Sequence, residues 1–71
     1  MDYLELDRLI ECIPYGDVVR IEGLDGDVLY RGTVRDLRKD GLDDDVLIAD
    51  VLRVEIENDE DGQYIAINVY C

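Results

Sequence analysis

Two segments near the end of the chain alternate apolar and polar residues, and a short acidic turn separates them. The segments are VLRVEIEN (residues 51–58) and QYIAINVY (residues 63–70), and the turn is DEDG. Alternation with a period of two is typical of a strand that buries one face, and Asp-Gly is a strong hairpin signal. The sequence therefore predicts a β-hairpin with Asp61-Gly62 as its loop.

One register of this hairpin places the apolar residues of both strands on one face and most polar residues on the other. On the face expected to be buried, it pairs Ile56 with Ile67, Val54 with Val69, and Leu52 with Cys71. On the opposite face it pairs Glu55 with Asn68, Glu57 with Ala66, and Arg53 with Tyr70. A slip of one residue would bring every aliphatic side chain opposite a polar one, so the pattern predicts which face is buried.

A second hairpin is predicted earlier in the chain, where DVVRIEG and DVLYRGT flank Asp25-Gly26. Asp-Gly is typical of a two-residue type I′ turn. That loop would pair Ile21 with Tyr30, Val19 with Gly32, Arg20 with Arg31, and Glu22 with Leu29. Like charges directly opposite each other repel, so the two arginines require nearby carboxylates, for which Glu22 is a candidate.

Two helices are expected around the first hairpin. Tyr3, Leu6, Ile10 and Ile13 recur at helical spacing before Pro14, with Asp2 as the cap and Glu5 completing a capping box. After the hairpin, Thr33 is expected to cap a helix of about two turns, with Asp36 three residues on and Gly41 as its left-handed stop.

These elements predict a single α+β domain over residues 1–71. Its order is N-terminal helix, β-hairpin, short helix and β-hairpin, and the two hairpins are expected to form a four-stranded antiparallel sheet covered by the helices. Residues 46–49 (VLIA) are left open between a β-strand and a loop or helical turn.

The charge of the chain limits its partners. The net charge is -12, and residues 40–61 hold ten acidic residues against Arg53 alone. Nucleic-acid binding depends on Lys and Arg displacing counterions, so direct nucleic-acid binding is not expected. No apolar run approaches the roughly 18 residues of a membrane span, and the N-terminus lacks the basic start of a signal peptide. We therefore expect a cytoplasmic protein without a membrane partner.

The residue types also argue against catalysis and metal binding. The chain has no His and no Ser, which removes the usual acid–base and nucleophilic motifs. An EF-hand alignment starting at Asp36 places Arg38 and Leu47 at ligand positions, which is incompatible with a calcium cage. Cys12 and Cys71 are far apart in sequence and are expected to be thiols. We expect no enzyme activity, no metal and no cofactor.

The outward face of the second hairpin supplies the candidate partner-binding site. Tyrosine and arginine are enriched at interface hot spots, and in the expected register Tyr64 and Tyr70 point away from the core. The alternative is that Tyr70 forms an ordinary cation–π pair with Arg53. The candidate residues are Arg53, Glu55, Glu57, Asp59, Tyr64, Asn68 and Tyr70.

The sequence therefore predicts a small acidic non-enzymatic protein that binds another protein, with a homodimer left open. A second hypothesis is an inhibitor that imitates nucleic acid. It requires the carboxylates of residues 40–45 and 53–61 to form one continuous negative surface that occupies the basic groove of a DNA- or RNA-binding protein. The alternative explanation is that the acidic residues keep the protein soluble and protect the edges of the sheet.

Nearly the whole chain resembles a group of short uncharacterised proteins from Firmicutes genomes and their phages or prophages. The resemblance implies a bacterial, mobile-element setting and carries no activity. It rests on turn glycines and core positions: Ile13, Pro14, Gly16, Val19, Arg20, Ile21, Gly26, Tyr30, Gly32, Thr33, Val34, Leu37, Val54, Glu55, Ile56, Gly62, Ile67 and Val69.

A second resemblance is to Sm-like small barrels. Residues 18–37 and 46–51 are similar to the first Sm motif, with Gly26 and Gly32 at its glycines and "VLIA" in its third strand. This resemblance implies an Sm/SH3-like β-barrel with an N-terminal helix that assembles into rings. The RNA-contacting Asn of that family falls near Asp45, and the tail lacks the Arg-Gly pair of the second motif.

Overall fold

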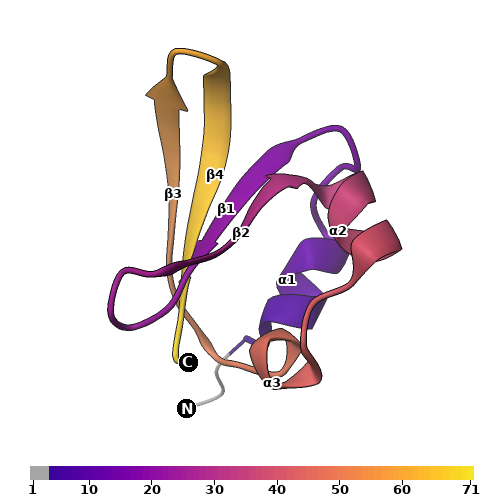
Figure 1. The fold of residues 1–71 in the computed structure, drawn as a ribbon, viewed down its shortest axis with the longest axis vertical. Coiled ribbons are helices and arrows are strands. Elements are labelled where there is room, and N and C mark those ends of the chain that lie inside the picture. The colour runs from indigo at the N-terminus through magenta and orange to yellow at the C-terminus, as the bar shows by residue number, and fades with distance from the viewer. Residues whose placement is uncertain (1–3) are drawn as a thin grey trace.

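Three short helices pack on a four-stranded sheet in the computed structural model, which describes residues 4–71 (Figure 1). The elements follow the order α1 (Leu6–Glu11), β1 (Val18–Glu22), β2 (Val28–Thr33), α2 (Val34–Asp40), α3 (Asp44–Leu47), β3 (Val51–Asp59) and β4 (Gly62–Val69). The α+β class is confirmed. No helix among the described residues is long and apolar enough to cross a membrane.

The sheet is mixed, so the prediction of a purely antiparallel sheet is wrong. The strand order is β2-β1-β4-β3, and the central strands β1 and β4 are parallel neighbours. The helical connection explains this direction. It carries the chain from β2 across to the opposite edge, where β3 starts in the same direction as β2, as a helical crossover requires. Because β4 turns back from β3, it runs parallel to β1.

The first hairpin has the expected register over three pairs: Val19–Gly32, Arg20–Arg31 and Ile21–Tyr30. The expected pair Glu22–Leu29 is wrong, because a bulge places Glu22 opposite Val28. The Gly26 amide donates to the Gly23 carbonyl at 3.1 Å, so the turn begins earlier than Asp25. A type I′ turn needs positive φ at both central residues, and among residues 4–71 only glycines have positive φ. The predicted type I′ turn at Asp25-Gly26 is therefore wrong.

The second hairpin forms with a register two residues from the expected one. Ile56 pairs with Ile65, Val54 with Ile67, and Glu57 with Tyr64. The turn explains the shift, since the Asp59 carboxylate accepts a hydrogen bond from the Asp61 amide at 2.9 Å and makes Glu60-Asp61 the loop. A shift of two residues preserves which side chains share a face, so the expected faces are kept although all six expected pairs are wrong.

Both expected helices are present, but only α2 begins and ends as predicted. Thr33 caps α2 by accepting from the Asp36 amide at 3.2 Å, and the helix stops at Gly41 with φ +78, as predicted. In α1, Glu5 is the N-cap residue with extended backbone instead of the third helical residue. The reason is tertiary pairing, because Glu5 forms a bridge with Asp50. The expected cap Asp2 and helical residue Tyr3 lie outside the described residues.

Residues 46–49, which the sequence left open, do not form a strand: Val46 and Leu47 end the helical turn α3, and a turn follows it at residues 48–49. The Val46 and Leu47 amides both donate to the Asp43 carbonyl, at 2.9 and 3.1 Å. A strand at this position, as the Sm-like alternative requires, is therefore wrong, and α2 is present where that alternative has no helix.

The core lies between the helices and one face of the sheet, here called the core face. It is made by Leu6, Ile10, Ile13, Val19, Ile21, Val34, Leu37, Val46, Ala49, Ile67 and Val69. On β3 the expected burial is wrong, because Leu52, Val54 and Ile56 are 47%, 47% and 65% exposed. Cys71, which the expected register placed opposite Leu52, is exposed, and both Cys71 and Cys12 are free thiols. Strand β3 is an edge strand, and the helices cover the part of the sheet nearer β1 and β2 (Figure 1).

Candidate functional site

The β3–β4 hairpin projects beyond the rest of the sheet (Figure 1). Its parallel pairing with β1 starts at Val19–Ile65, so residues 62–64 of β4 extend past the paired part of β1. Residues 58–63 at the tip of the hairpin are exposed and accessible to a partner.

The structure brings six of the seven candidate residues onto one face of this hairpin, which we call the polar face. Register pairs Arg53 with Asn68 and Glu57 with Tyr64, while Glu55 and Asp59 lie on the same side. Tyr70 is separate, because it follows the end of β4 and is 65% exposed. The expected pairing of Tyr70 with Arg53 is wrong, since Asn68 occupies that position.

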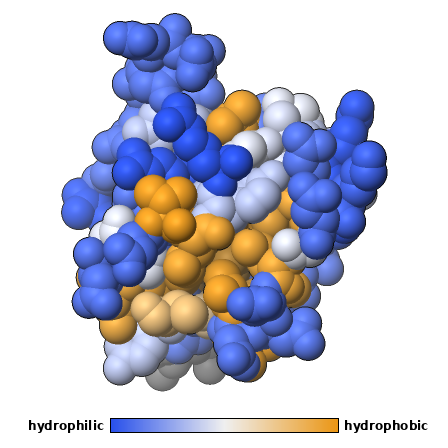
Figure 2. All heavy atoms as spheres, viewed as in Figure 1, coloured by the Kyte–Doolittle hydropathy of each residue, from blue (hydrophilic) through white to orange (hydrophobic). Residues whose placement is uncertain are grey.

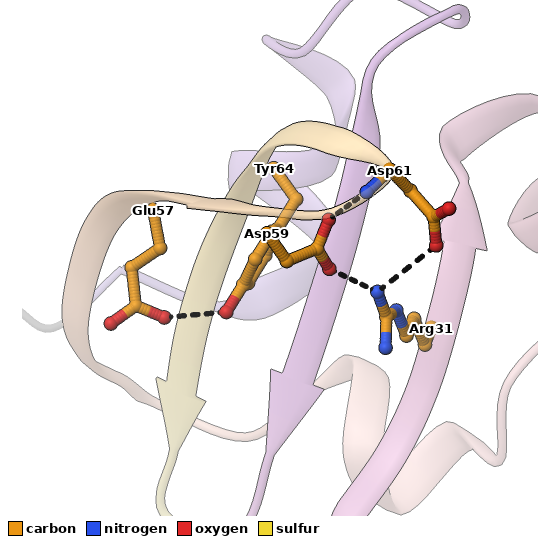
Figure 3. Close-up of polar contacts among 5 residues, drawn as sticks. All are labelled: Arg31, Glu57, Asp59, Asp61 and Tyr64. Atoms are coloured by element: carbon orange, nitrogen blue, oxygen red, sulfur yellow. Dashed lines mark hydrogen bonds and ion pairs between the residues drawn. The ribbon is translucent and has the colours of Figure 1, made fainter.

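Side chains on the polar face are largely engaged with one another (Figure 3). The Tyr64 hydroxyl donates to Glu57 Oε2 at 2.8 Å. Arg53 forms an ion pair with Glu55. Asp59 forms an ion pair with Arg31, whose Nη2 also lies 4.0 Å from Asp61 Oδ2. A partner that binds this face would have to compete with these contacts.

Arg31 is the residue of this site that the sequence did not assign. It lies on β2, yet it reaches Asp59, and its guanidinium carbon is 5.8 Å from the Tyr64 ring centroid. The sequence signal for Arg31 was its expected position opposite Arg20, because two like charges at paired positions need nearby carboxylates to offset their repulsion. Glu22 supplies one, with Oε1 2.9 Å from Arg20 Nη2. The carboxylates for Arg31 come from the other hairpin, which the parallel pairing of β1 and β4 brings close.

The environment of Tyr64 raises the pKa of its hydroxyl. The hydrogen bond to Glu57 is the main cause, and partial burial adds to it. Because the folded state holds the proton more tightly than the unfolded chain, this contribution to stability is complete below the unfolded pKa of about 10 and is lost as the pH rises above it.

Tyr64→Phe is therefore expected to flatten the pH dependence of stability at alkaline pH. Urea unfolding of both proteins between about pH 9 and pH 11 measures it. The wild type should lose more stability over this interval than the variant. Parallel curves for the two proteins would show that the hydrogen bond to Glu57 does not act on the hydroxyl in solution.

The two acidic segments lie in different parts of the fold. The β3–β4 turn lies at one end of the molecule, and the α2–α3 connection with residues 40–45 lies beside the helices, far from that turn (Figure 1). On the polar face, Arg20, Arg31 and Arg53 each pair with a carboxylate. The inhibitor that imitates nucleic acid stays a hypothesis, because it requires these two separate acidic segments to act as one surface.

Val54 and Ile56 stand on the opposite side of β3 from the polar face. A pocket of about 250 Å³ lies beside Ile56, between the hairpin and the chain entering β1, and Asp17 lines it together with Gly16, Val18, Ile56, Gln63, Tyr64 and Ile65. Figure 2 shows hydrophobic residues gathered across the middle of the view, below the hydrophilic hairpin tip. Exposed apolar side chains beside a pocket are typical of a protein interaction site.

Within residues 4–71 no group of three or more acidic or cysteine side chains is arranged to hold a metal ion. The geometry offers an exposed surface made by one hairpin. The resemblance of the chain to short phage and prophage proteins stays a prediction. Comparisons with known protein families, with curated proteins and with solved structures found no significant match.

Proposed function

We propose that this protein acts by binding another protein through the β3–β4 hairpin, and that it does so without catalysing a reaction. The observation that carries the proposal is the exposure of Ile56 (65%) and Val54 (47%) on the face of the sheet that elsewhere forms the core. When a partner covers these aliphatic side chains, binding is favoured by about 25 cal/mol per Å² of apolar surface that is buried.

Three features support the hairpin over other surfaces. It projects from the body of the molecule, so a partner can approach both of its faces (Figure 1). It carries the pocket beside Ile56. Its polar face presents Tyr64 and Arg53, and tyrosine and arginine are enriched at interface hot spots.

Capture experiments with matched variants test the proposal. Because the sequence resembles short phage and prophage proteins, a bacterial lysate is the source of candidate partners. Ile56→Asp places a charge on the exposed part of β3 and is expected to reduce capture about tenfold or more. Ile48→Asp is the control, since Ile48 is 63% exposed but lies outside the hairpin.

Both variants should fold like the wild type, which circular dichroism checks. Captured proteins should be lost with Ile56→Asp and retained with Ile48→Asp. If the two variants capture the same proteins as the wild type in equal amounts, the hairpin is not the binding element.

A further inference from the structure

The outer edge of β3 offers backbone hydrogen-bonding groups in addition to side chains. Strand β3 is at the edge of the sheet and is nine residues long. At its start the edge is occupied, because the Val51 amide donates to the Leu4 carbonyl at 2.8 Å. Among residues 4–71, no strand pairs with this edge from Leu52 to Asp59. This length suits a strand of the usual five to six residues.

The side chains along this edge alternate between two chemistries. Val54 and Ile56 are exposed on the core face, while Glu55 and Glu57 are on the polar face. The strand and its turn carry one basic residue, Arg53, which already pairs with Glu55. The acidic residues of this segment are Glu55, Glu57, Asp59, Glu60 and Asp61.

A second copy of the chain is a poor occupant of this edge. Antiparallel pairing about Glu55 places Glu55 opposite itself, and pairing about Ile56 places Glu55 opposite Glu57. Like charges directly opposite each other destabilise a sheet. Pairing about Val54 would place Arg53 opposite Glu55 of the other copy instead, but Arg53 already forms an ion pair with Glu55 of its own strand. The net charge of -12 on each copy adds repulsion.

We propose that β3 binds an extended segment of a basic partner protein, which joins the sheet as a fifth strand. This rests on the proposed function and names the chemistry of the partner. The segment alternates aliphatic residues, which cover Val54 and Ile56, with Lys or Arg residues, which face Glu55 and Glu57. Main-chain hydrogen bonds hold the strand, and the alternating side chains give the specificity.

Selection from a display library of random linear peptides about eight residues long tests this inference with the full chain as the target. The enriched peptides are expected to alternate aliphatic and basic residues. When synthesised, they should bind Ile56→Asp about tenfold or more weakly than the wild type, and should bind Ile48→Asp with wild-type affinity. A version with Glu in place of each Lys or Arg should not bind, and raising the salt concentration should weaken binding.

These experiments distinguish a failure of the fifth-strand inference from a failure of the proposed function. Enriched peptides that lack basic residues but still depend on Ile56 would overturn the inference and leave the hairpin as the binding element. The same follows if sedimentation shows a dimer of the chain that Ile56→Asp dissociates. If no peptide is enriched, or if none depends on Ile56, the fifth-strand inference is wrong, and the capture experiment then decides the proposed function separately.

Discussion

Ile67→Ala is expected to lower the free energy of unfolding by about 3 kcal/mol, whereas Ile56→Ala should lower it by less than about 1 kcal/mol. The two substitutions remove the same atoms. Ile67 is fully buried in the central strand β4, between β1 and β3, while Ile56 is 65% exposed at the edge. The cost of removing a buried side chain includes the cavity that it leaves, and an exposed side chain leaves none.

Urea unfolding of the wild type and both variants measures this difference. A domain of this size has a total stability of about 4–10 kcal/mol, so Ile67→Ala removes a large part of it. Equal losses from the two variants would show that a further element covers Ile56 in solution, and would contradict the exposed edge on which the proposed function depends.

Gly32→Ala is expected to destabilise the protein by about 2–3 kcal/mol. Gly32 has φ +155, and a Cβ at this position would lie 2.7 Å from the Tyr30 hydroxyl oxygen. The tyrosine cannot move away without loss, because its hydroxyl donates to the Thr33 carbonyl at 2.9 Å next to the start of α2. The substitution therefore adds backbone strain and also breaks this contact.

Gly16→Ala is the matched control for this experiment. A Cβ on Gly16 would meet no atom within 4 Å, and Gly16 is not among the glycines with positive φ. We expect a change within about 0.5 kcal/mol, since replacing Gly by Ala at a compatible site mainly restricts the unfolded chain. Thermal or urea unfolding of both variants checks the pair. A loss of equal size in both would contradict the structural role of Gly32.

The local sequence signals predicted local structure well. Thr33, Asp36 and Gly41 define both ends of α2, because capping depends on groups three or four residues apart. Three pairs of the first hairpin are correct as well, although its turn begins before Asp25 and a bulge follows at Glu22. The register of the second hairpin was missed by two residues, because a pattern of period two cannot distinguish shifts of two. The Asx hydrogen bond of Asp59 decides it.

The arrangement of the hairpins could not be obtained from these patterns. Alternation shows which face of a strand is apolar, but not which edges join or how far the helices extend over the sheet. The parallel pairing of β1 with β4 therefore remained hidden, and with it the contact between Arg31 and Asp59. The helices do not reach Val54 and Ile56, so residues expected in the core became the exposed part of the candidate site.

Photo-crosslinking from β3 in the living cell tests most directly whether the hairpin is the binding element. A photoreactive phenylalanine derivative replaces Ile56 in one version of the full chain and Ile48 in another, at similar exposure of the original side chains. We predict a discrete crosslinked partner from position 56 and none from position 48. Crosslinks to the same protein from position 48, with none from position 56, would contradict the account.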